Sequence, residues 1–262
     1  MSKYTEVNLN GHVVKKHRRD IKKDAVIRRF IPQKPSAVFE SSAGNAILAR
    51  ELQQEGHSVT ISNYVSEGHK DIKEIFADLN KPLDLPDESF DVVICREVIE
   101  HVESVPFVLR EFNRILKPDG TLILTFPNRL HIRSRFLHLL TGFYRGMKSP
   151  INLDVPYGYA HINLIGYPEM DYFLRKTGYD VVDVDSSYYQ TSDSIFLLVK
   201  PLFALATRHY LLSYKKHAEE HEKTKPANRA YNSFIAEKLT SRPLFIGKDV
   251  IIAATKGTRR FP

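Results

Sequence analysis

Two short apolar runs with an amphipathic segment between them form the most regular part of the chain. Residues 91–95 and 121–126 are rich in β-branched and aliphatic side chains, which is typical of buried strands. The segment between them places apolar residues largely at helical spacing, at Val105, Phe107, Val108, Leu109, Phe112, Ile115 and Leu116. The pattern predicts two parallel strands, buried on both faces and joined by a helix in a right-handed crossover.

Strands and helices also alternate before and after this unit. Residues 37–40 form a short apolar run that ends at Glu40, and a turn of small residues then leads into an amphipathic helix. Further runs of strand length are found at residues 58–63, 75–79, 179–184 and 249–254. Such alternation is typical of an α/β fold with a mainly parallel sheet.

Residues 1–35 are polar and basic and differ from the rest of the chain. An apolar set suits one amphipathic helix, formed by Ile21, Ala25, Val26 and Phe30. We expect a flexible start followed by a helix that covers the sheet. The basic cluster KKHRRDIKK is interpreted as a solvated helix face, with a contact to lipid headgroups or phosphate as the alternative.

Composition narrows the classes of protein and partner. In 262 residues, a hydrophobic content of 42% is enough to build a full core. The net charge of +7 favours anionic partners, which leaves nucleic acid, anionic lipid and acidic glycans open. The single cysteine, Cys95, excludes a disulfide within the chain and a cysteine-based metal site. We see no signal peptide and no apolar run of about 18 residues, and expect a soluble or peripheral cytoplasmic protein.

The amino-acid sequence of residues 77–128 contains motifs specific enough to identify a family resemblance. The motifs LDLPDESFDVV, EVIEHV, LKPDG and TFPN follow one another in this order. In this the chain resembles the second half of class I S-adenosylmethionine-dependent methyltransferases, and the resemblance covers about residues 37–184 and the last strand. It implies a three-layer α/β sandwich with a mostly parallel, seven-stranded, Rossmann-like sheet whose last strand is antiparallel.

The resemblance also implies how the chain is divided. A basic, helical extension at residues 1–35 precedes a methyltransferase-like domain at residues 36–262. The domain carries a cap insertion at about residues 129–166 and a helical insertion at about residues 187–243.

The glycine-rich turn departs from the family pattern of an acidic residue followed by G-x-G-x-G. Here the sequence is ESSAGNA, in which Glu40 and Gly44 are kept while Ser42 and Ala46 replace glycines. Glycine allows positive φ and a close approach of the backbone to a ligand. The resemblance implies that Glu40, Ser42 and Gly44 contact S-adenosylmethionine. The alternative is a turn that has lost the cofactor.

Other cofactor contacts are implied residue by residue. Asn63 occupies the place of the carboxylate that usually binds the ribose hydroxyls, which predicts weaker cofactor binding. Glu67 lies close by in the sequence and could bind the ribose in place of that carboxylate; the alternative is that it is a surface loop glutamate. Asp78 and Leu79 match the family's pair of residues that contact the adenine ring, the first through its carboxylate and the second through its main-chain amide. The alternative for Asp78 is that it only caps the end of a strand. Beside the methionine portion we expect Arg96 and Glu97.

Two histidines are the candidates for catalysis. His161 begins the motif HINLIGYPE, which lies at the rim of the active site in the family, and suits a general base or substrate-orienting role. His101 in EVIEHV is interpreted as a structural or cofactor-side histidine, with proton handling as the alternative. Candidates for lining the acceptor pocket are Tyr157, Tyr159, Arg133 and Arg135.

The late insertion begins with the apolar and then basic run SIFLLVKPLFALATRHYLLSYKK. We expect Lys200 and Pro201 to interrupt it, so that no continuous span is long enough to cross a bilayer. A helix lying in the headgroup plane and a helix facing the protein are the two alternatives. The histidines at positions 209, 217 and 221 lack a metal-site pattern, and we expect no bound metal.

The function expected from this resemblance is methyl transfer from S-adenosylmethionine, with S-adenosylhomocysteine as product. We favour O-methylation of a saccharide, a lipid-linked glycan or another small hydroxyl-bearing acceptor. An anionic membrane surface is an expected partner, with the protein peripheral at its inner face, whereas nucleic acid is not. The alternative function is a catalytically inactive scaffold or regulatory protein of the same fold. Dinucleotide-dependent oxidoreduction is disfavoured because its phosphate-binding glycines are absent.

Overall fold

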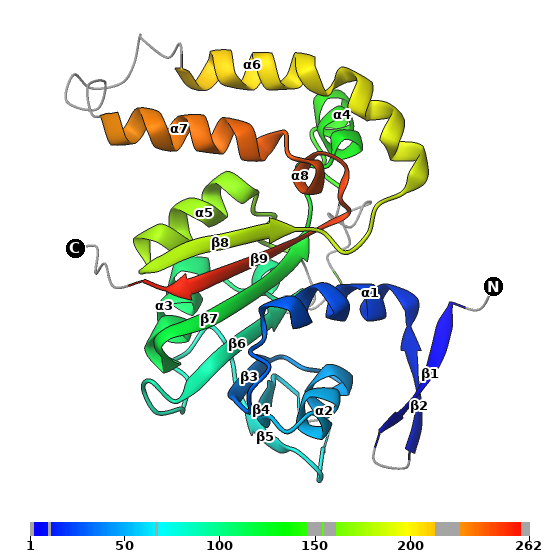
Figure 1. The fold of residues 1–262 in the computed structure, drawn as a ribbon, viewed down its shortest axis with the longest axis vertical. Helices are drawn as coiled ribbons and strands as arrows, with labels where there is room; N and C mark the ends of the chain where they lie inside the picture. The colour runs from blue at the N-terminus through cyan, green and yellow to red at the C-terminus, as the bar shows by residue number, and fades with distance from the viewer. Residues whose placement is uncertain are drawn as a thin grey trace.

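A seven-stranded sheet forms the centre of the molecule (Figure 1). The computed structural model describes residues 3–9, 12–65, 68–145, 154, 161–212 and 226–257. The strands in chain order are β3 Ala37–Ser41, β4 Ser58–Asn63, β5 Lys73–Phe76, β6 Phe90–Arg96, β7 Leu116–Pro127, β8 Tyr179–Asp185 and β9 Asp249–Lys256. Their order in the sheet is β5-β4-β3-β6-β7-β9-β8. The strands from β5 to β7 are parallel, and β9 is antiparallel to both of its neighbours, which confirms the predicted fold class.

The strand order places a crevice at the carboxyl ends of β3 and β6. From β3 the chain proceeds outward to β4 and β5, and it then returns to β6 on the other side of β3. The connections that leave β3 and β6 therefore diverge, and such a switch point is where open parallel sheets bind ligands.

Helices cover both faces of the sheet. Helices α1 Arg18–Ile27 and α2 Ile47–Gln54 pack on one face against alternate strand residues such as Val92 and Ile94. On the other face, α3 Val105–Ile115 and α5 Tyr167–Lys176 pack against Val93 and Cys95. Consecutive residues of β6 thus point to opposite cores, because strand side chains alternate. Both faces being buried explains why this strand is a continuous apolar run.

The N-terminus forms a hairpin where we expected a flexible start. Strands β1 Tyr4–Leu9 and β2 His12–His17 pair antiparallel and lead directly into α1. Lys16 is 4% exposed, and its Nζ lies 2.5 Å from Asp24 of α1 and 2.7 Å from Glu51 of α2. This buried cation holds the hairpin against both helices, and such a contact between distant residues is not visible in the sequence.

The third strand of the domain ends earlier than predicted. We expected a strand at residues 75–79, but β5 is Lys73–Phe76. Asp78 Oδ1 instead accepts hydrogen bonds from the backbone and side-chain nitrogens of Asn80, at 3.0 and 3.1 Å. Aspartate that bonds two residues ahead forms a turn, which competes with strand pairing.

The late insertion forms a long helical arm at the edge of the sheet (Figure 1). It comprises the 3₁₀ helix η4 Thr191–Val199 and the helices α6 Lys200–Leu212, α7 Pro226–Leu239 and α8 Arg242–Ile246. Contrary to our expectation, the helical run Thr191–Leu212 continues through Lys200 and Pro201. Its 22 residues contain an 18-residue stretch with a mean hydropathy of 1.4, so the run is long and apolar enough to cross a membrane by length and composition. Pro201 is tolerated because it lies in the first turn of α6, where its missing amide is not needed.

A small third core attaches this arm to the domain. Ile132 of α4 Ile132–Thr141 is fully buried with Phe245 and Ile246 of α8. Phe196 and Phe203 of the arm pack against this group. The predicted cap insertion is therefore helical over α4, and half of its remainder lies outside the described residues.

Candidate functional site

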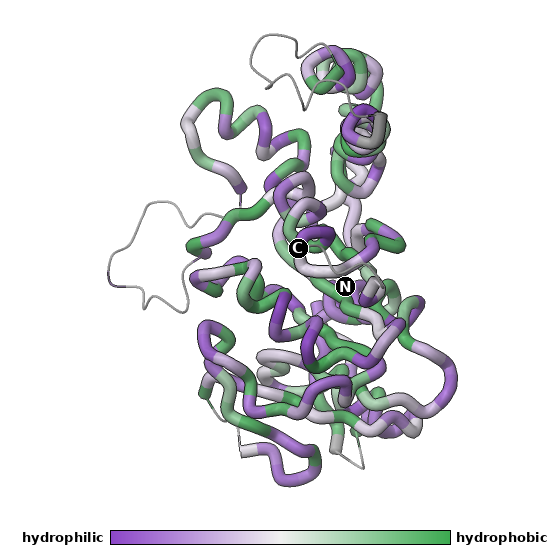
Figure 2. The backbone as a smooth tube through the Cα atoms, turned by 90° about the vertical axis from the view of Figure 1, so that its left-hand side faces the viewer, coloured by the Kyte–Doolittle hydropathy of each residue, from purple (hydrophilic) through white to green (hydrophobic). Residues whose placement is uncertain are grey.

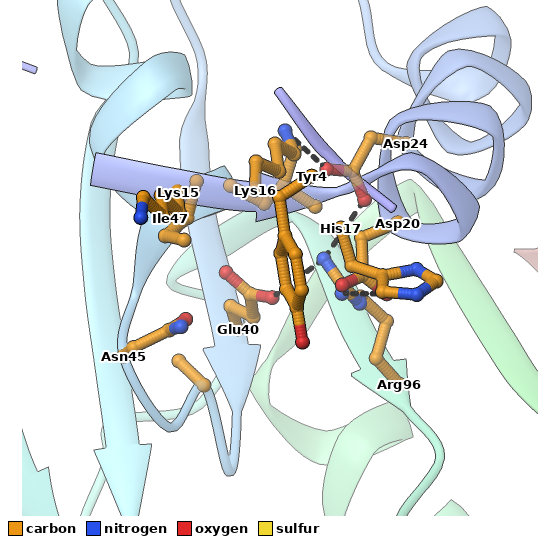
Figure 3. Close-up of a pocket in the computed structure, with 12 residues that line it drawn as sticks. Tyr4, Lys15, Lys16, His17, Asp20, Asp24, Glu40, Asn45, Ile47 and Arg96 are labelled. Atoms are coloured by element: carbon orange, nitrogen blue, oxygen red, sulfur yellow. Dashed lines mark hydrogen bonds and ion pairs between the residues drawn. The ribbon is translucent and has the colours of Figure 1, made fainter. Parts of the chain in front are cut away.

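A cavity of about 400 Å³ lies at the carboxyl end of β3 (Figure 3). Its floor includes Glu40 and Asn45 and the first residues of α2. The N-terminal hairpin and α1 cover it, and Arg96 from the end of β6 lines it as well. The cavity thus occupies the crevice predicted from the strand order.

Glu40 brings an unsatisfied carboxyl group to this cavity. The residue is 2% exposed, and among the described residues its Oε2 has no hydrogen-bond partner. Its pKa is raised to about 7, and burial is the main cause. The positive charge of Arg96, with Nη1 3.9 Å from Oε1, opposes the rise, whereas the negative charge of Asp24 adds to it. A carboxyl that lacks a full partner suits a ligand that brings an amine or another positive charge.

The altered turn keeps the backbone shape that glycines would give it. Ser42, Gly44 and Ala46 have φ of 51°, 55° and 53°, so every second residue is left-handed. For Ser42 and Ala46 this conformation costs roughly 1 to 2 kcal/mol each. A Cβ built on Gly44 would meet no atom within 4 Å, so the space above the turn is open to a ligand. The turn therefore fits a cofactor despite its sequence.

Asn63 makes a contact that the sequence did not reveal. Its Oδ1 accepts from the Gly44 amide at 2.8 Å, and its Nδ2 donates to Glu74 Oε1 at 2.8 Å. His69 Nε2 lies 2.7 Å from the Gly44 carbonyl oxygen on the same turn. Asn63 thus fixes the turn, and its contact with a ribose stays a prediction. Glu67, the suggested substitute, lies outside the described residues.

The predicted adenine pair lies in the loop that follows β5. Asp78 is half-buried within its turn with Asn80, and Leu79 is buried. The Asn80 side-chain oxygen accepts from the Glu103 amide at 2.7 Å, which connects this loop to the start of α3. The contacts of Asp78 match the alternative of a capping residue, while the adenine contact stays a prediction.

Arg96 and Glu97 connect the sheet to α1. Arg96 Nη1 donates to Asp24 Oδ1 at 2.8 Å. Glu97 Oε1 accepts from Lys23 Nζ at 2.8 Å and from Thr125 Oγ1 at 2.9 Å. Both side chains therefore position the helix that covers the cavity, and Arg96 also lines it.

A second cavity, of about 570 Å³, lies at the end of β7. Four basic side chains line it, from Arg19, Lys23, Arg145 and Lys248. Its carboxylate, Asp249, already accepts from Ser186 Oγ at 2.7 Å and from Ser187 Oγ at 2.5 Å. Lys23 and Lys248 already lie 2.8 Å from Glu97 and 2.6 Å from Asp193, so Arg19 and Arg145 are the cations that make the cavity suit an anionic group. Sequence reasoning missed it because the four basic residues come from three distant segments, α1, the region after α4 and the residue before β9.

The two candidate catalytic histidines lie together. His101 belongs to the 3₁₀ helix η2 Ile99–His101, and its ring centroid is 4.7 Å from that of His161. Beside them Glu100 is 2% exposed, and burial together with the charge of Glu97 raises its pKa to about 8. The structure thus joins two predicted residues and adds Glu100, while their catalytic roles stay predictions.

The arginines expected in the acceptor pocket make structural contacts, and their contact with an acceptor stays a prediction. Arg133 Nε donates to Asp193 Oδ1 at 2.5 Å, and Arg135 Nη2 donates to the Leu239 carbonyl oxygen of α7 at 2.7 Å. Asp193 is fully buried and lies in η4, where Lys248 Nζ also approaches it at 2.6 Å. These contacts fasten the helical arm to the domain. The expected pocket residues Tyr157 and Tyr159 lie outside the described residues.

This chain is similar to known methyltransferases in both sequence and fold. Residues 14–184 match the family described as methyltransferase domain. A ubiquinone biosynthesis O-methyltransferase of Neisseria meningitidis is 25% identical over 175 residues, which cover 62% of this chain and 71% of that protein. Among solved structures, a SAM-dependent methyltransferase from Archaeoglobus fulgidus has a TM-score of 0.57 at 17% identity, covering 92% of this chain and 95% of the other. A Burkholderia thailandensis N1-methyltransferase with bound S-adenosylhomocysteine gives 0.52 at 13% identity, covering 92% and 79%.

Proposed function

Because the chain belongs to the methyltransferase-domain family and is an S-adenosylmethionine-dependent methyltransferase, we propose that it methylates a hydroxyl oxygen of a small, anionic acceptor. A saccharide or lipid-linked glycan that carries a phosphate is the acceptor class that fits best. The similarity to an enzyme named as an O-methyltransferase supports oxygen as the acceptor atom.

The cofactor-side residues fit this activity. S-adenosylmethionine supplies the methyl group from a positively charged sulfonium. Glu40 offers a buried carboxyl oxygen without a partner in the described structure, and the turn around Gly44 leaves open space beside it. The alternative of an inactive scaffold rested on the lost glycines together with the missing ribose carboxylate at Asn63. The first of these two grounds loses weight because the turn keeps its left-handed residues.

The basic cavity at the end of β7 is the observation that carries the acceptor proposal. It shares α1 with the first cavity, since Asp20 and Asp24 line one and Arg19 and Lys23 line the other. A phosphate bound among these cations would be held beside the cofactor crevice. Holding two reactants close and aligned supplies much of the acceleration in a displacement of this kind.

An exposed apolar surface on the helical arm supports a membrane-bound acceptor. Four of its side chains lie on η4 and α6 and are 66 to 80% exposed: Ile195, Leu198, Leu202 and Leu205. Leu139 and Leu140 of α4 extend it, since the neighbouring Phe136 contacts both Phe196 and Phe203. Figure 2 shows hydrophobic positions mixed with hydrophilic ones along the helices beyond the sheet.

We propose that this surface rests on an anionic membrane, with the protein in the cytoplasm and peripheral at the membrane's inner face. Lys200 and the exposed Arg208 lie on the same helix, and the whole chain carries a net charge of +7. Apolar residues flanked by cations match a bilayer surface of acidic lipids, whereas a second copy of this cationic chain would be repelled.

Replacing cations in the basic cavity tests the acceptor proposal. With a phosphate-linked saccharide as acceptor, Arg19→Glu and Arg145→Glu should each raise KM about tenfold or more, because a charge-assisted bond contributes about 1.5 to 3 kcal/mol. Calorimetry should show unchanged S-adenosylhomocysteine binding. Arg110→Glu, an exposed residue of α3, is the matched control. Equal turnover of the acceptor without its phosphate would contradict the proposal.

A further inference from the structure

We propose that Glu100, His101 and His161 bind one divalent transition-metal ion, with Zn²⁺ as its best-fitting representative. Each residue offers one ligand atom, a carboxylate oxygen or a ring nitrogen, and these atoms all lie within 4.8 Å of one another. Two ligand atoms at bond lengths of about 2.0 to 2.2 Å from one ion are at most about 4.4 Å apart, so small side-chain movements would let these three atoms share an ion.

The backbone brings the three ligands together from two segments. Helix η2 presents Glu100 and His101 directly after β6. The Asn163 amide donates to the Glu100 carbonyl oxygen at 2.9 Å, and the Asn163 side chain donates to the Val102 carbonyl oxygen. These bonds hold the segment that begins at His161 against η2, so the position of the third ligand is fixed by contacts independent of its ring.

Unsatisfied polar atoms point to a missing ligand. Glu100 is 2% exposed, yet its Oε2 has no hydrogen-bond partner in the described part of the chain, and neither does Nδ1 of His161. Leaving a buried donor or acceptor unpaired costs about 1 to 3 kcal/mol. Glu97 adds negative charge nearby, while Lys23 is engaged by Glu97 itself. A bound cation would satisfy both orphaned atoms.

The donor set indicates the class of ion. Two imidazole nitrogens and one carboxylate oxygen suit zinc, iron or a related transition metal, whereas magnesium and calcium prefer oxygen ligands alone. Three protein ligands also leave a coordination position open, which is typical of catalytic rather than structural zinc sites. The sequence did not suggest this site because His161 lies far along the chain from the EVIEHV motif.

A role for the ion follows only if the proposed O-methylation is correct. A metal ion lowers the pKa of an oxygen that it binds. An acceptor hydroxyl in the open position would lose its proton to water, with the electron pair of the broken O–H bond left on oxygen. His161 would then act as a ligand that positions the acceptor, in place of the general base predicted from the sequence.

Titration of the full chain with metal tests the site without any acceptor. Protein stripped with EDTA should bind one Zn²⁺ per chain by calorimetry, and more weakly Mg²⁺. Glu100→Gln and His161→Ala should each weaken Zn²⁺ binding about 100-fold or more, because each removes one of three ligands. His138→Ala, an exposed histidine of α4, should bind Zn²⁺ as the unchanged protein does.

Circular dichroism and S-adenosylhomocysteine binding show whether each variant is folded, and His161→Gln serves as a second variant of similar size. Absence of a Zn²⁺ titration, or equal binding by His161→Gln and His138→Ala, would overturn the site. One bound Zn²⁺ that the ligand variants lose supports it even if no hydroxyl acceptor is methylated, a result that would contradict only the proposed function. Full methylation by the stripped protein in EDTA would overturn the role of the ion.

Discussion

Ser42 and Ala46 show how a side chain can occupy a position that favours glycine. Both have φ near +50°, but Ser42 is half-buried, whereas Ala46 is fully buried in the core between the sheet and helices α1 and α2. The conformation is set by the tertiary contacts of the turn, among them the bond from the Gly44 amide to Asn63. The identity of these residues alone left the shape of the turn undecided.

Glycine substitutions at these two positions should therefore differ. Ser42→Gly relieves roughly 1 to 2 kcal/mol of backbone strain and adds about 0.5 to 1 kcal/mol of unfolded-state entropy, so we expect slightly higher stability. Ala46→Gly gains the same relief but loses a buried methyl group worth about 0.8 kcal/mol, so we expect little change. Urea unfolding measures both. A Ser42→Gly protein less stable than Ala46→Gly would contradict this account.

The buried carboxyl of Glu40 should make stability depend on pH. Its pKa in the folded protein is about 7, above the ordinary value of 4.5, because of burial first. Between these two values the unfolded chain releases the proton while the folded protein retains it, so stability falls as pH rises through this range and is constant above it. At about 1.4 kcal/mol for each tenfold difference in proton affinity, the loss is about 3 kcal/mol.

Glu40→Gln should abolish that part of the pH dependence. Denaturant unfolding at several values between pH 4.5 and 8 should give a flatter profile for the variant than for the unchanged protein. Glu103→Gln, at an exposed glutamate, is the control and should keep the original slope. Parallel profiles for all three proteins would show that Glu40 is not a buried acid.

At the scale of elements, α1 is the segment on which both cavities depend. Its acidic residues Asp20 and Asp24 line the first cavity, and Arg19 and Lys23 line the second. Arg96 and Glu97 at the end of β6 hold it through Asp24 and Lys23. One helix thus joins the predicted cofactor side to the proposed acceptor side.

The helical arm should bind anionic vesicles through its apolar residues. We expect the full chain to sediment with vesicles of phosphatidylglycerol and phosphatidylcholine, and the double variant Leu198→Glu and Leu202→Glu to stay in solution. Val182→Glu changes an exposed apolar residue on β8, away from the arm, and should sediment normally. Raising the salt to about 1 M should weaken binding, because the screening length falls to about 3 Å.

Three outcomes would contradict this peripheral placement. No sedimentation at low salt would remove the membrane as partner. Binding that survives both salt and alkaline carbonate would indicate that Thr191–Leu212 spans the bilayer, as its length and composition permit. Concentration-dependent dimers in analytical ultracentrifugation, lost in the double variant, would indicate that a second copy covers the surface.

At the scale of the whole molecule, the sequence predicted most of the sheet and its helices but not the structure of the helical arm. The core strands follow from continuous apolar runs, and α3 follows from apolar residues at helical spacing that are all buried at Val105, Val108, Leu109, Phe112 and Ile115. The hairpin, the early end of β5 and the continuous helix through Pro201 were mispredicted. Each depends on a contact or a position within a turn rather than on periodicity.

The sequence by itself determined the alternation of strands and helices, the family, and the place of Glu40 and Arg96 at the ends of their strands beside the first cavity. These follow from local spacing and short motifs, which a linear chain displays directly. Only the tertiary structure decided that Asn63 holds the glycine turn and that basic residues from three distant segments share one cavity. It alone brought His161 beside Glu100 and His101. Such groupings arise when parallel strands align their carboxyl ends, so residues far apart in the chain meet at one edge of the sheet.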